Sequence, residues 1–542
     1  MGYFSFTNIA VTLTTLIVAR RIYWELTTGS RQRSIAQTYG CLPPKQKKWK
    51  DPFLSADAMI GNYRAIKAHG LLDFWGSWLK DNDAHTIWTK ILGSPIILTI
   101  DPENVKSILA TQFSHFSVGQ ERINLLSASI GKGIFTSDGA EWKHSRDMLR
   151  PCFERNQVAD TLMLDRHVTR LIETLPTDGS TVNLQVPFQR LAFDITSDFL
   201  LGKSVNALST LDEQNSASRD FVEAFDYVMD PLSEKNKNAR WGMFAMFLPD
   251  AEHKRCVKRL QNFVDNIISE ELSSQKNATT NAVEPSDPVP KPPVNRHLFL
   301  TSLLSETSDL VRARSELLNI LAAGRDATSA VLTNLFYELP RHPTVYKRLE
   351  AEIRLHASPS SPSSPDEPPT YDQLKNMKYL RAVINEVQRI YPILPSNSRQ
   401  AIKDSVLPRG GGTDGMSPML VPKGTYVAYH VHSLQRRHDI YGADANEFVP
   451  ERWLDPEHDN DAGTERNEKL RPGWAYIPFN GGPRVCIGQN FAMTQVMFVL
   501  VRMMQMFDIE SRDDEPWREK ITLTCSNLGG AKVGLKRKQE LA

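Results

Sequence analysis

One cysteine near the end of the chain stands in a setting that suits a low-pKa thiolate. Cys486 follows the glycine pair Gly481 and Gly482 and precedes Gly488, and an apolar helical run starts at Phe491. Glycines allow backbone conformations that turn amide N–H groups toward the sulfur, and the positive end of a helix dipole favours a negative ligand. A thiolate held in this way can bind heme iron, pushing electron density onto the metal and favouring O–O cleavage.

Two neighbours extend this hypothesis. Arg484 is a permanently charged fork donor that suits a heme propionate, and Gly488 has no Cβ, which suits a backbone pressed against a porphyrin. The alternative is a buried structural cysteine in a glycine turn, the usual situation of a lone cysteine. Other parts of a heme site must therefore be present upstream if the first interpretation holds.

Upstream, a helical run ends at a proline and carries an acid and a base on one face. Glu386 and Arg389 lie in the run from Tyr379 to Pro392. The spacing i, i+3 places them on the same side of a helix. Further on, Arg452 stands in the segment Phe-Val-Pro-Glu-Arg-Trp. An exposed ion pair on a solvated helix is the alternative interpretation of the first two residues.

These segments, in this order, resemble the cytochrome P-450 superfamily. The spacing of five residues near the C-terminus looks like its heme-binding signature: Phe479, Gly482, Arg484, Cys486 and Gly488. The resemblance implies heme b as the cofactor, with Cys486 as the iron ligand.

The resemblance also assigns roles to residues outside that signature. It implies that Glu386, Arg389 and Arg452 form a buried network whose role is to fix geometry behind the heme rather than to add stability. Trp142 and Arg146, one helical turn apart, resemble the pair that holds the propionates. Arg399, on the strand expected after the Glu386 helix, occupies the corresponding place for a third propionate contact; surface positions are the alternative for all three.

A fourth match contains a departure from the family pattern. The segment Leu317–Leu332 resembles the long oxygen-activating helix, in which an acid and an alcohol relay protons, and it contributes Asp326 as the acid. Ala327 stands where the family has threonine, and Thr328 comes one residue later. One residue corresponds to about 100° around a helix. Either a local π-bulge brings Thr328 to the oxygen site, or an ordered water or a substrate hydroxyl replaces the missing donor. Polar residues on a core helix without a catalytic role remain the alternative.

Composition and periodicity predict one large, mainly helical catalytic domain. The chain has 542 residues, 41% of them hydrophobic, and a net charge of +1. This charge gives no indication of nucleic-acid binding. Helical periodicity dominates, and short β segments are expected at Thr86–Ile100 and Thr425–His432, giving a mainly α fold with small β-sheets. Five scattered cysteines without a CxxC pair argue against a disulfide framework or a zinc site and favour a reducing compartment.

The N-terminal segment predicts a membrane anchor. Tyr3 to Ala19 is uncharged and mostly apolar. A helix of this length spans only about 26 Å, slightly less than a hydrocarbon core. Eight Lys or Arg follow between residues 20 and 50 against the single acid Glu25. By the positive-inside rule this keeps the following domain cytoplasmic. We therefore expect a transmembrane signal anchor at 1–19 in the endoplasmic reticulum, a basic linker with a Pro-Pro break at 20–50, and the catalytic domain at 51–542.

Within the superfamily, the chain is most similar to fungal membrane-bound alkane and fatty-acid ω-hydroxylases. The segments Gly133–Pro151, Ala323–Asp326 and Asp439–Gly442 carry this likeness, whereas Ala327 and Gln435, where histidine is usual, depart from it. The resemblance implies hydroxylation of a lipophilic substrate with O₂ and electrons from a separate NADPH-cytochrome reductase, with cytochrome b5 as an optional second donor. No nicotinamide or flavin fingerprint lies in the chain itself.

Several alternatives stay open at this point. Ala327 is compatible with a heme-thiolate isomerase, dehydratase or peroxygenase that needs no proton relay, and a heme sensor or electron carrier is the non-enzymatic alternative. Gly324 and Asp326 argue against a sensor or electron carrier. In the oxygen-activating helix of the family a glycine opens a groove for oxygen, and a sensor needs no such groove. A fatty-acid or alkane chain competes as substrate with an intermediate of secondary metabolism, and the sequence does not choose between them.

Overall fold

The computed structural model describes residues 6–52, 55–153, 160–209, 216–230, 250–280, 298–357, 367–455 and 470–538. These residues divide into two compact units. The first comprises residues 1–117, 396–434 and 481–483, and the second comprises 118–395, 435–480 and 484–542. Each unit is therefore assembled from segments that are distant in the sequence.

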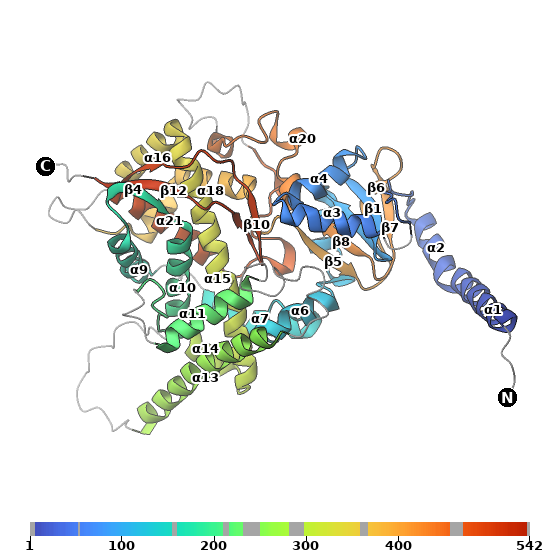
Figure 1. The fold of residues 1–542 in the computed structure, drawn as a ribbon, viewed down its shortest axis with the longest axis horizontal. Coiled ribbons are helices and arrows are strands. Elements are labelled where there is room, and N and C mark those ends of the chain that lie inside the picture. The colour runs from blue at the N-terminus through green and yellow to red at the C-terminus, as the bar shows by residue number, and fades with distance from the viewer. Residues whose placement is uncertain are drawn as a thin grey trace. The chain divides into compact units, whose positions relative to one another are not determined.

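The first unit is built around a five-stranded sheet (Figure 1). Its strand order is β1 (Thr86–Ile91), β2 (Ser94–Thr99), β8 (Tyr426–Tyr429), β5 (Asn397–Ala401) and β3 (Phe116–Ser117). All neighbours are antiparallel except β2 and β8, which run parallel. A second hairpin pairs β6 (Ser405–Gly411) with β7 (Ser417–Val421). Besides the N-terminal helical segment, the α-helices of this unit are α3 (Ala56–Lys67), α4 (Leu71–Lys80), α5 (Pro102–Lys106) and α19 (Val431–Leu434). The two β segments expected from the sequence are confirmed.

The N-terminal helix extends further than the sequence predicted. Helix α1 (Phe6–Trp24) continues through a π-helical turn, η1 (Glu25–Gly29), into α2 (Ser30–Thr38), so the segment expected as a linker is largely helical. Its charges support the helix, because Glu25 pairs with both Arg21 and Arg33. The chain leaves the helical conformation only at Gly40, whose φ is +63°, before the two prolines.

The membrane anchor expected at the N-terminus is not confirmed. Among the residues that the structure describes, no helix is both long and apolar enough to cross a bilayer. Residues 1–5 of the expected anchor lie outside the described residues.

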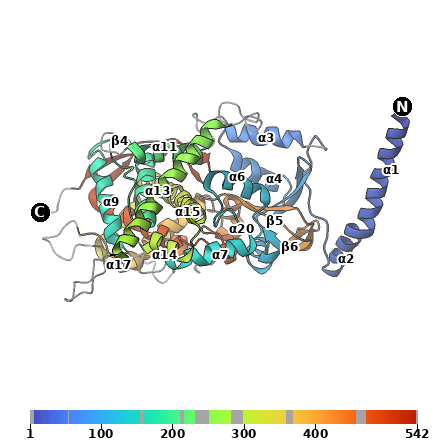
Figure 2. The same cartoon turned by 90° about the horizontal axis from the view of Figure 1, so that it is seen from below.

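The second unit consists mostly of helices, seen from two directions in Figures 1 and 2. Their bounds are α6 Gln120–Ile130, α7 Gly139–Leu149, α9 Thr161–Thr174, α10 Gln185–Leu201, α11 Ser216–Met229, α13 Ala251–Thr280, α14 Leu298–Glu306, α15 Leu310–Glu338, α16 Pro343–His356, α17 Tyr371–Asn376, α18 Lys378–Ile390, α20 His438–Tyr441 and α21 Gln489–Met506. A three-stranded sheet joins β4 (Asp178–Asn183), β12 (Lys532–Arg537) and β9 (Phe507–Ser511), and a hairpin pairs β10 (Glu519–Ile521) with β11 (Cys525–Asn527). The mainly helical fold with small sheets is confirmed.

Helix α15 is the central element of this unit, and glycine lets a neighbour approach it closely. Most of its side chains are buried, and α10 lies alongside it. A Cβ added at Gly324 would come within 2.6 Å of the Thr196 side chain on α10. Any larger residue at position 324 would therefore push the two helices apart.

A fully buried charge network connects α18 to the segment that follows α20. Glu386 accepts hydrogen bonds from the Nε and Nη2 atoms of Arg389 and from the Nε of Arg452, all at 2.8 Å. The Trp453 indole N–H and the Val449 backbone N–H complete its coordination at 2.9 Å. Five donors thus converge on one carboxylate, and the three charged side chains are no more than 1% exposed.

The donors of the two arginines that point away from Glu386 are satisfied by backbone carbonyls. Arg389 donates to the carbonyl oxygens of Gln435, Ala445 and Glu447, and Arg452 donates to those of Tyr441 and Asp444. The network therefore fixes the path of the segment 435–453 against α18. The predicted buried network of Glu386, Arg389 and Arg452 is present, and its role in fixing the geometry behind a heme stays a prediction. Buried ion pairs contribute little net stability when compared with apolar residues.

Removing the carboxylate of Glu386 should lower the free energy of unfolding by much more than its ion pairs contribute to stability in the intact network. In Glu386→Gln, two buried guanidinium groups lose their counter-charge, and we expect the free energy of unfolding to fall by about 3–5 kcal/mol. Chemical denaturation of the purified protein measures this loss. Glu173→Gln, at an exposed position on α9, is the matched control. It should stay within about 0.5 kcal/mol of wild type; equal stabilities for the two variants would contradict the argument.

Candidate functional site

Cys486 lies directly before the first turn of α21. Its backbone N–H donates to the Phe479 carbonyl oxygen at 2.9 Å and closes the loop between them. Gly488 is the N-cap residue of α21, and its backbone N–H is hydrogen-bonded to the Cys486 sulfur. The expected position at a helix N-terminus is thus observed, and the positive end of the helix dipole lies next to the thiol.

The environment of the thiol acts on its pKa in both directions. The Cys486 side chain is exposed to solvent, yet the protein atoms that surround it at longer range desolvate it and raise its pKa. The Gly488 N–H and the positive charge of Arg146 oppose this and lower the pKa. Burial is the largest of these effects on the pKa of Cys486, and the Gly488 N–H and Arg146 offset it only in part.

The glycines around Cys486 serve purposes that the sequence only partly indicated. Gly482 has a φ of +64°, and a Cβ there would lie 1.9 Å from the Leu109 carbonyl oxygen. This position therefore accepts only glycine. Gly481 has no positive φ, whereas Asn480 does. A Cβ at Gly488 would meet the Phe153 ring at 3.3 Å, which is a second constraint besides the one expected from a porphyrin.

Three of the predicted propionate-binding residues come together beside Cys486. Trp142 and Arg146 lie one turn apart on α7, and the Arg146 guanidinium donates to the Val485 carbonyl oxygen at 2.8 Å. Arg484 stacks on the Trp142 ring, with its Cζ 4.4 Å from the ring centroid. Arg484 also forms an ion pair with Asp138 at 2.6 Å, a partner that the sequence did not indicate.

Arg399 belongs to the first unit and is described within it. It lies on β5 and is 4% exposed, and its Nη1 donates to the Ser398 carbonyl oxygen at 2.8 Å. Its buried Nε has no hydrogen-bond partner among the residues that the structure describes. A buried guanidinium N–H without a partner is costly, so this atom fits an acceptor supplied by a bound group.

Gln435, noted as a departure from the family pattern, has a structural role. It is fully buried, and its amide nitrogen donates to the carbonyl oxygens of Gln388 and Arg389 at the end of α18. Its amide oxygen accepts from the Ile477 N–H at 3.2 Å. Gln435 therefore connects α18 to the chain that leads into the Cys486 loop.

The first half of α15 holds the loop between α6 and α7. Glu316 accepts from the Ile134 N–H at 3.0 Å, and the Asn319 amide bonds the Phe135 N–H and the Ile130 carbonyl oxygen. A Cβ at Gly133 would lie 2.7 Å from the Asn319 side chain. These contacts position α7, which carries Trp142 and Arg146, and nothing in the sequence indicated them.

The two candidate relay residues on α15 point in different directions. The helix is α-helical from Leu310 to Glu338, so the π-bulge considered for Thr328 is not present. Asp326 and Thr328 are two positions apart, which places them about 200° apart around the helix. Thr328 is 4% exposed, whereas the Asp326 side chain borders a cavity. An acid–alcohol pair acting side by side is therefore not formed by these two residues.

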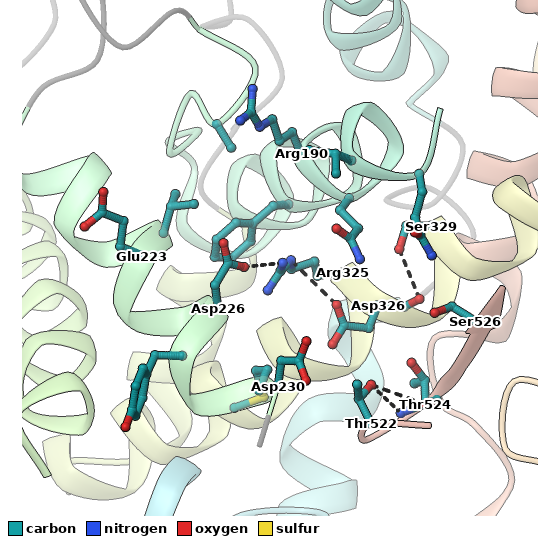
Figure 3. A pocket seen from close by; sticks show the side chains of 18 of the residues that line it. Arg190, Glu223, Asp226, Asp230, Arg325, Asp326, Ser329, Thr522, Thr524 and Ser526 are labelled. Atoms are coloured by element: carbon teal, nitrogen blue, oxygen red, sulfur yellow. Dashed lines mark hydrogen bonds and ion pairs between the residues drawn. The ribbon is translucent and has the colours of Figure 1, made fainter. Parts of the chain in front are cut away.

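The cavity beside Asp326 has a volume of about 610 Å³, and its wall carries both acidic and basic side chains (Figure 3). Residues from α10, α11, α13, α15 and the β10–β11 hairpin line it. Arg325 forms ion pairs with Asp226 on α11 and, at 3.6 Å, with Asp326. Burial raises the pKa of Asp326; Arg325 and Lys520 act to lower it, and Asp226 and Asp230 act to raise it. Sequence reasoning missed Asp226 and Lys520, because nothing in the sequence pairs them with α15.

The residues present fit an anionic, flat iron cofactor. The thiol of Cys486 with its N–H donor suits an axial ligand. The buried Trp142 and the partly buried Arg146 and Arg484 beside it suit the edge that carries acidic groups. This set of residues defines a protein of the heme-thiolate class.

Comparison with known proteins gives the same class. The family model described as cytochrome P450 matches residues 60–530. The chain is 37% identical to cytochrome P450 monooxygenase himC of Aspergillus japonicus, covering 99% of this chain and 91% of the relative. It is 35% identical to cytochrome P450 monooxygenase FPY7 of Fusarium mangiferae (98% and 96% covered) and 40% identical to cytochrome P450 52A4 of Candida maltosa (84% and 81% covered).

The chain therefore belongs to the cytochrome P450 family. It is a monooxygenase that uses heme b, bound through a cysteine thiolate, and it depends on a separate redox partner and a lipophilic substrate. The predicted superfamily, cofactor and reaction class are confirmed.

Proposed function

We propose that this protein hydroxylates a lipophilic substrate, a fatty-acid or alkane-like chain or an intermediate of secondary metabolism, with Cys486 as the proximal ligand. The observation that carries the proposal is the Cys486 thiol, open to solvent, hydrogen-bonded by the Gly488 N–H and facing Arg146. Heme bound here supplies activation of O₂, and the thiolate increases electron donation to the iron. Gly488 and Arg146 favour the thiolate form of Cys486 against the effect of burial, and Phe479 supports the loop by packing against the core.

Trp142, Arg146, Arg484 and Arg399 are proposed to hold the propionates. The support is that Trp142 and Arg399 are buried, that Arg146 and Arg484 are partly buried, and that three of the four side chains are cationic. A guanidinium group also provides parallel N–H donors for a carboxylate. Arg484 would share its charge between Asp138 and a propionate.

Replacing the proposed ligand should remove the thiolate signature without unfolding the protein. In Cys486→Ser, we expect the reduced, carbon monoxide-bound protein to lose the absorption band typical of thiolate ligation, and NADPH-dependent product formation to fall at least about 10³-fold. Cys41→Ser, which removes a partly exposed thiol in the first unit, is the control and should keep both. An unchanged band in Cys486→Ser would exclude this cysteine as the ligand.

On the side of the heme where oxygen binds, we propose that Asp326 delivers protons and that Thr328 affects coupling, which is the product formed per NADPH consumed. Burial and the neighbouring acids raise the pKa of Asp326, so a larger share of it carries a transferable proton near neutral pH. Thr328 is buried on another face of α15, and its contribution would be to the helix geometry at Ala327. A water or a substrate hydroxyl then takes the place of the threonine that the family has at position 327.

Coupling measurements test both roles. We expect Asp326→Asn to lower the product formed per NADPH consumed by about 10-fold or more, since a general acid typically contributes about 10²–10⁴-fold. Thr328→Ala should lower coupling to a smaller extent, and Ala327→Thr should raise it. Unchanged coupling in Thr328→Ala would remove Thr328 from the mechanism, and unchanged coupling in Asp326→Asn would do the same for the acid.

The substrate class is tested by binding. Lipophilic ligands that displace a water from the iron change the heme absorption spectrum, so a panel of fatty acids, alkanes, polyketides and terpenoids can be titrated into the purified protein. A shift with fatty acids or alkanes supports the lipid-chain substrate. A shift with a polyketide or terpenoid alone identifies the secondary-metabolite substrate and excludes the first.

We further propose that the electrons come from an NADPH-cytochrome reductase, with cytochrome b5 as a second donor, at the endoplasmic reticulum. Residues 1–19 would act as the membrane anchor, residues 20–50 as the basic segment on the cytoplasmic side, and residues 51–542 as the catalytic domain. The support is the row of exposed apolar side chains on α1, from Val11 to Val18, next to Arg20 and Arg21. Deleting residues 1–24 should move the protein from the membrane pellet to the supernatant, and continued membrane association would reject this anchor.

A further inference from the structure

The contacts of Arg325 carry an inference about how the acid on α15 is controlled. Arg325 is 9% exposed, and its guanidinium packs over the neighbouring rings of Phe193 on α10 and Phe225 on α11, at 5.4 and 5.2 Å from their centroids, which are themselves 4.7 Å apart. The rings leave the guanidinium little freedom to move away from the two carboxylates it contacts. Figure 3 shows Arg325 between Asp226 on one side and Asp326 on the other.

We infer that Arg325 is a positioning residue shared by two carboxylates, through which Asp226 on α11 sets the protonation of Asp326 on α15. This inference rests on the proposed role of Asp326 in proton delivery. One cation cannot neutralise two acids equally, and the Asp226 contact is the shorter of the two. Asp226 therefore competes with Asp326 for the charge of Arg325, so that less of this charge remains to stabilise the ionised form of Asp326.

The other charged groups around the cavity do not set the protonation of Asp326 in place of Asp226 and Arg325. Lys520 on β10 is held by Asp230 at 2.8 Å, so these two groups largely cancel at Asp326. Tyr227 and Cys256 have pKa values raised first by burial and stay uncharged near neutral pH. The remaining titratable groups of the wall are Arg190, Arg219, Glu223, Glu252 and Arg259. The largest influences on the pKa of Asp326 are burial, then Arg325 and Asp226, followed by Asp230 and Lys520.

The two partners of the contact should therefore have opposite effects. Removing the negative charge in Asp226→Asn frees Arg325 for Asp326 and takes away a like charge, so the pKa of Asp326 falls. Removing the cation in Arg325→Gln takes away the opposing charge, so the pKa of Asp326 rises. A structural disruption of the cavity alone would not produce shifts of opposite sign.

The test is a pH titration of Asp326 in the heme-loaded enzyme without turnover. The C=O stretching band of the protonated carboxyl, assigned by its loss in Asp326→Asn, reports the charge state directly by infrared difference spectroscopy. We expect its midpoint to fall by about one pH unit in Asp226→Asn and to rise by about as much in Arg325→Gln. Arg325→Lys, which keeps the charge, and Asp220→Asn, an exposed acid on the same helix as Asp226, should stay close to wild type.

Shifts in the same direction, or no shift in Asp226→Asn, would overturn the inference. Asp226 is half exposed, so this variant is expected to fold and decides the question even if Arg325→Gln does not. The pH profile of product formed per NADPH separates the inference from the proposed function. If the band shifts as expected and the profile does not follow it, Arg325 still controls Asp326, and Asp326 is excluded from proton delivery.

Discussion

The convergence of five donors on Glu386 is the interaction on which the second unit depends. A buried carboxylate is tolerated only when its charge and its lone pairs are satisfied. Here Arg389, Arg452, Trp453 and a backbone N–H do so at distances up to 2.9 Å. The remaining donors of the arginines fix backbone carbonyls along residues 435–447. The segment that leads to Cys486 is thus held in one path against α18. Gln435 adds further hydrogen bonds to the C-terminal end of α18.

Helix α15 fixes the positions of a second group of elements in this unit. Its first half fixes the loop before α7 through Glu316 and Asn319, and thereby the helix that presents Trp142 and Arg146. Its second half presents Asp326 and Arg325 to a polar cavity. One helix therefore positions residues on the cofactor side and controls the charge of the acid. The close approach of α10 at Gly324 shows that this glycine serves helix packing.

Much of the site was predictable because its residues are close together in the sequence. Cys486 precedes a helix within three residues, and Trp142 and Arg146 are one turn apart, so local geometry places each of them. The spacing of Glu386 and Arg389 predicted a shared helix face, and the family order added Arg452 as their partner. The helix α15 was also evident, although its regular α-helical form removed the bulge that would have moved Thr328.

The sequence by itself determined the reaction class, the mainly helical fold and the segments that carry the chemistry, because short-range spacing and periodicity encode these features. Tertiary structure alone decided the partners that come from distant segments: Asp138 for Arg484, Glu316 for the loop before α7, and Asp226 for Arg325. It also decided the charge environment of Asp326, which depends on burial and on charges from α11 and β10. Such effects arise only when helices pack, since desolvation and Coulomb energies depend on distances through space, which spacing along the chain does not contain.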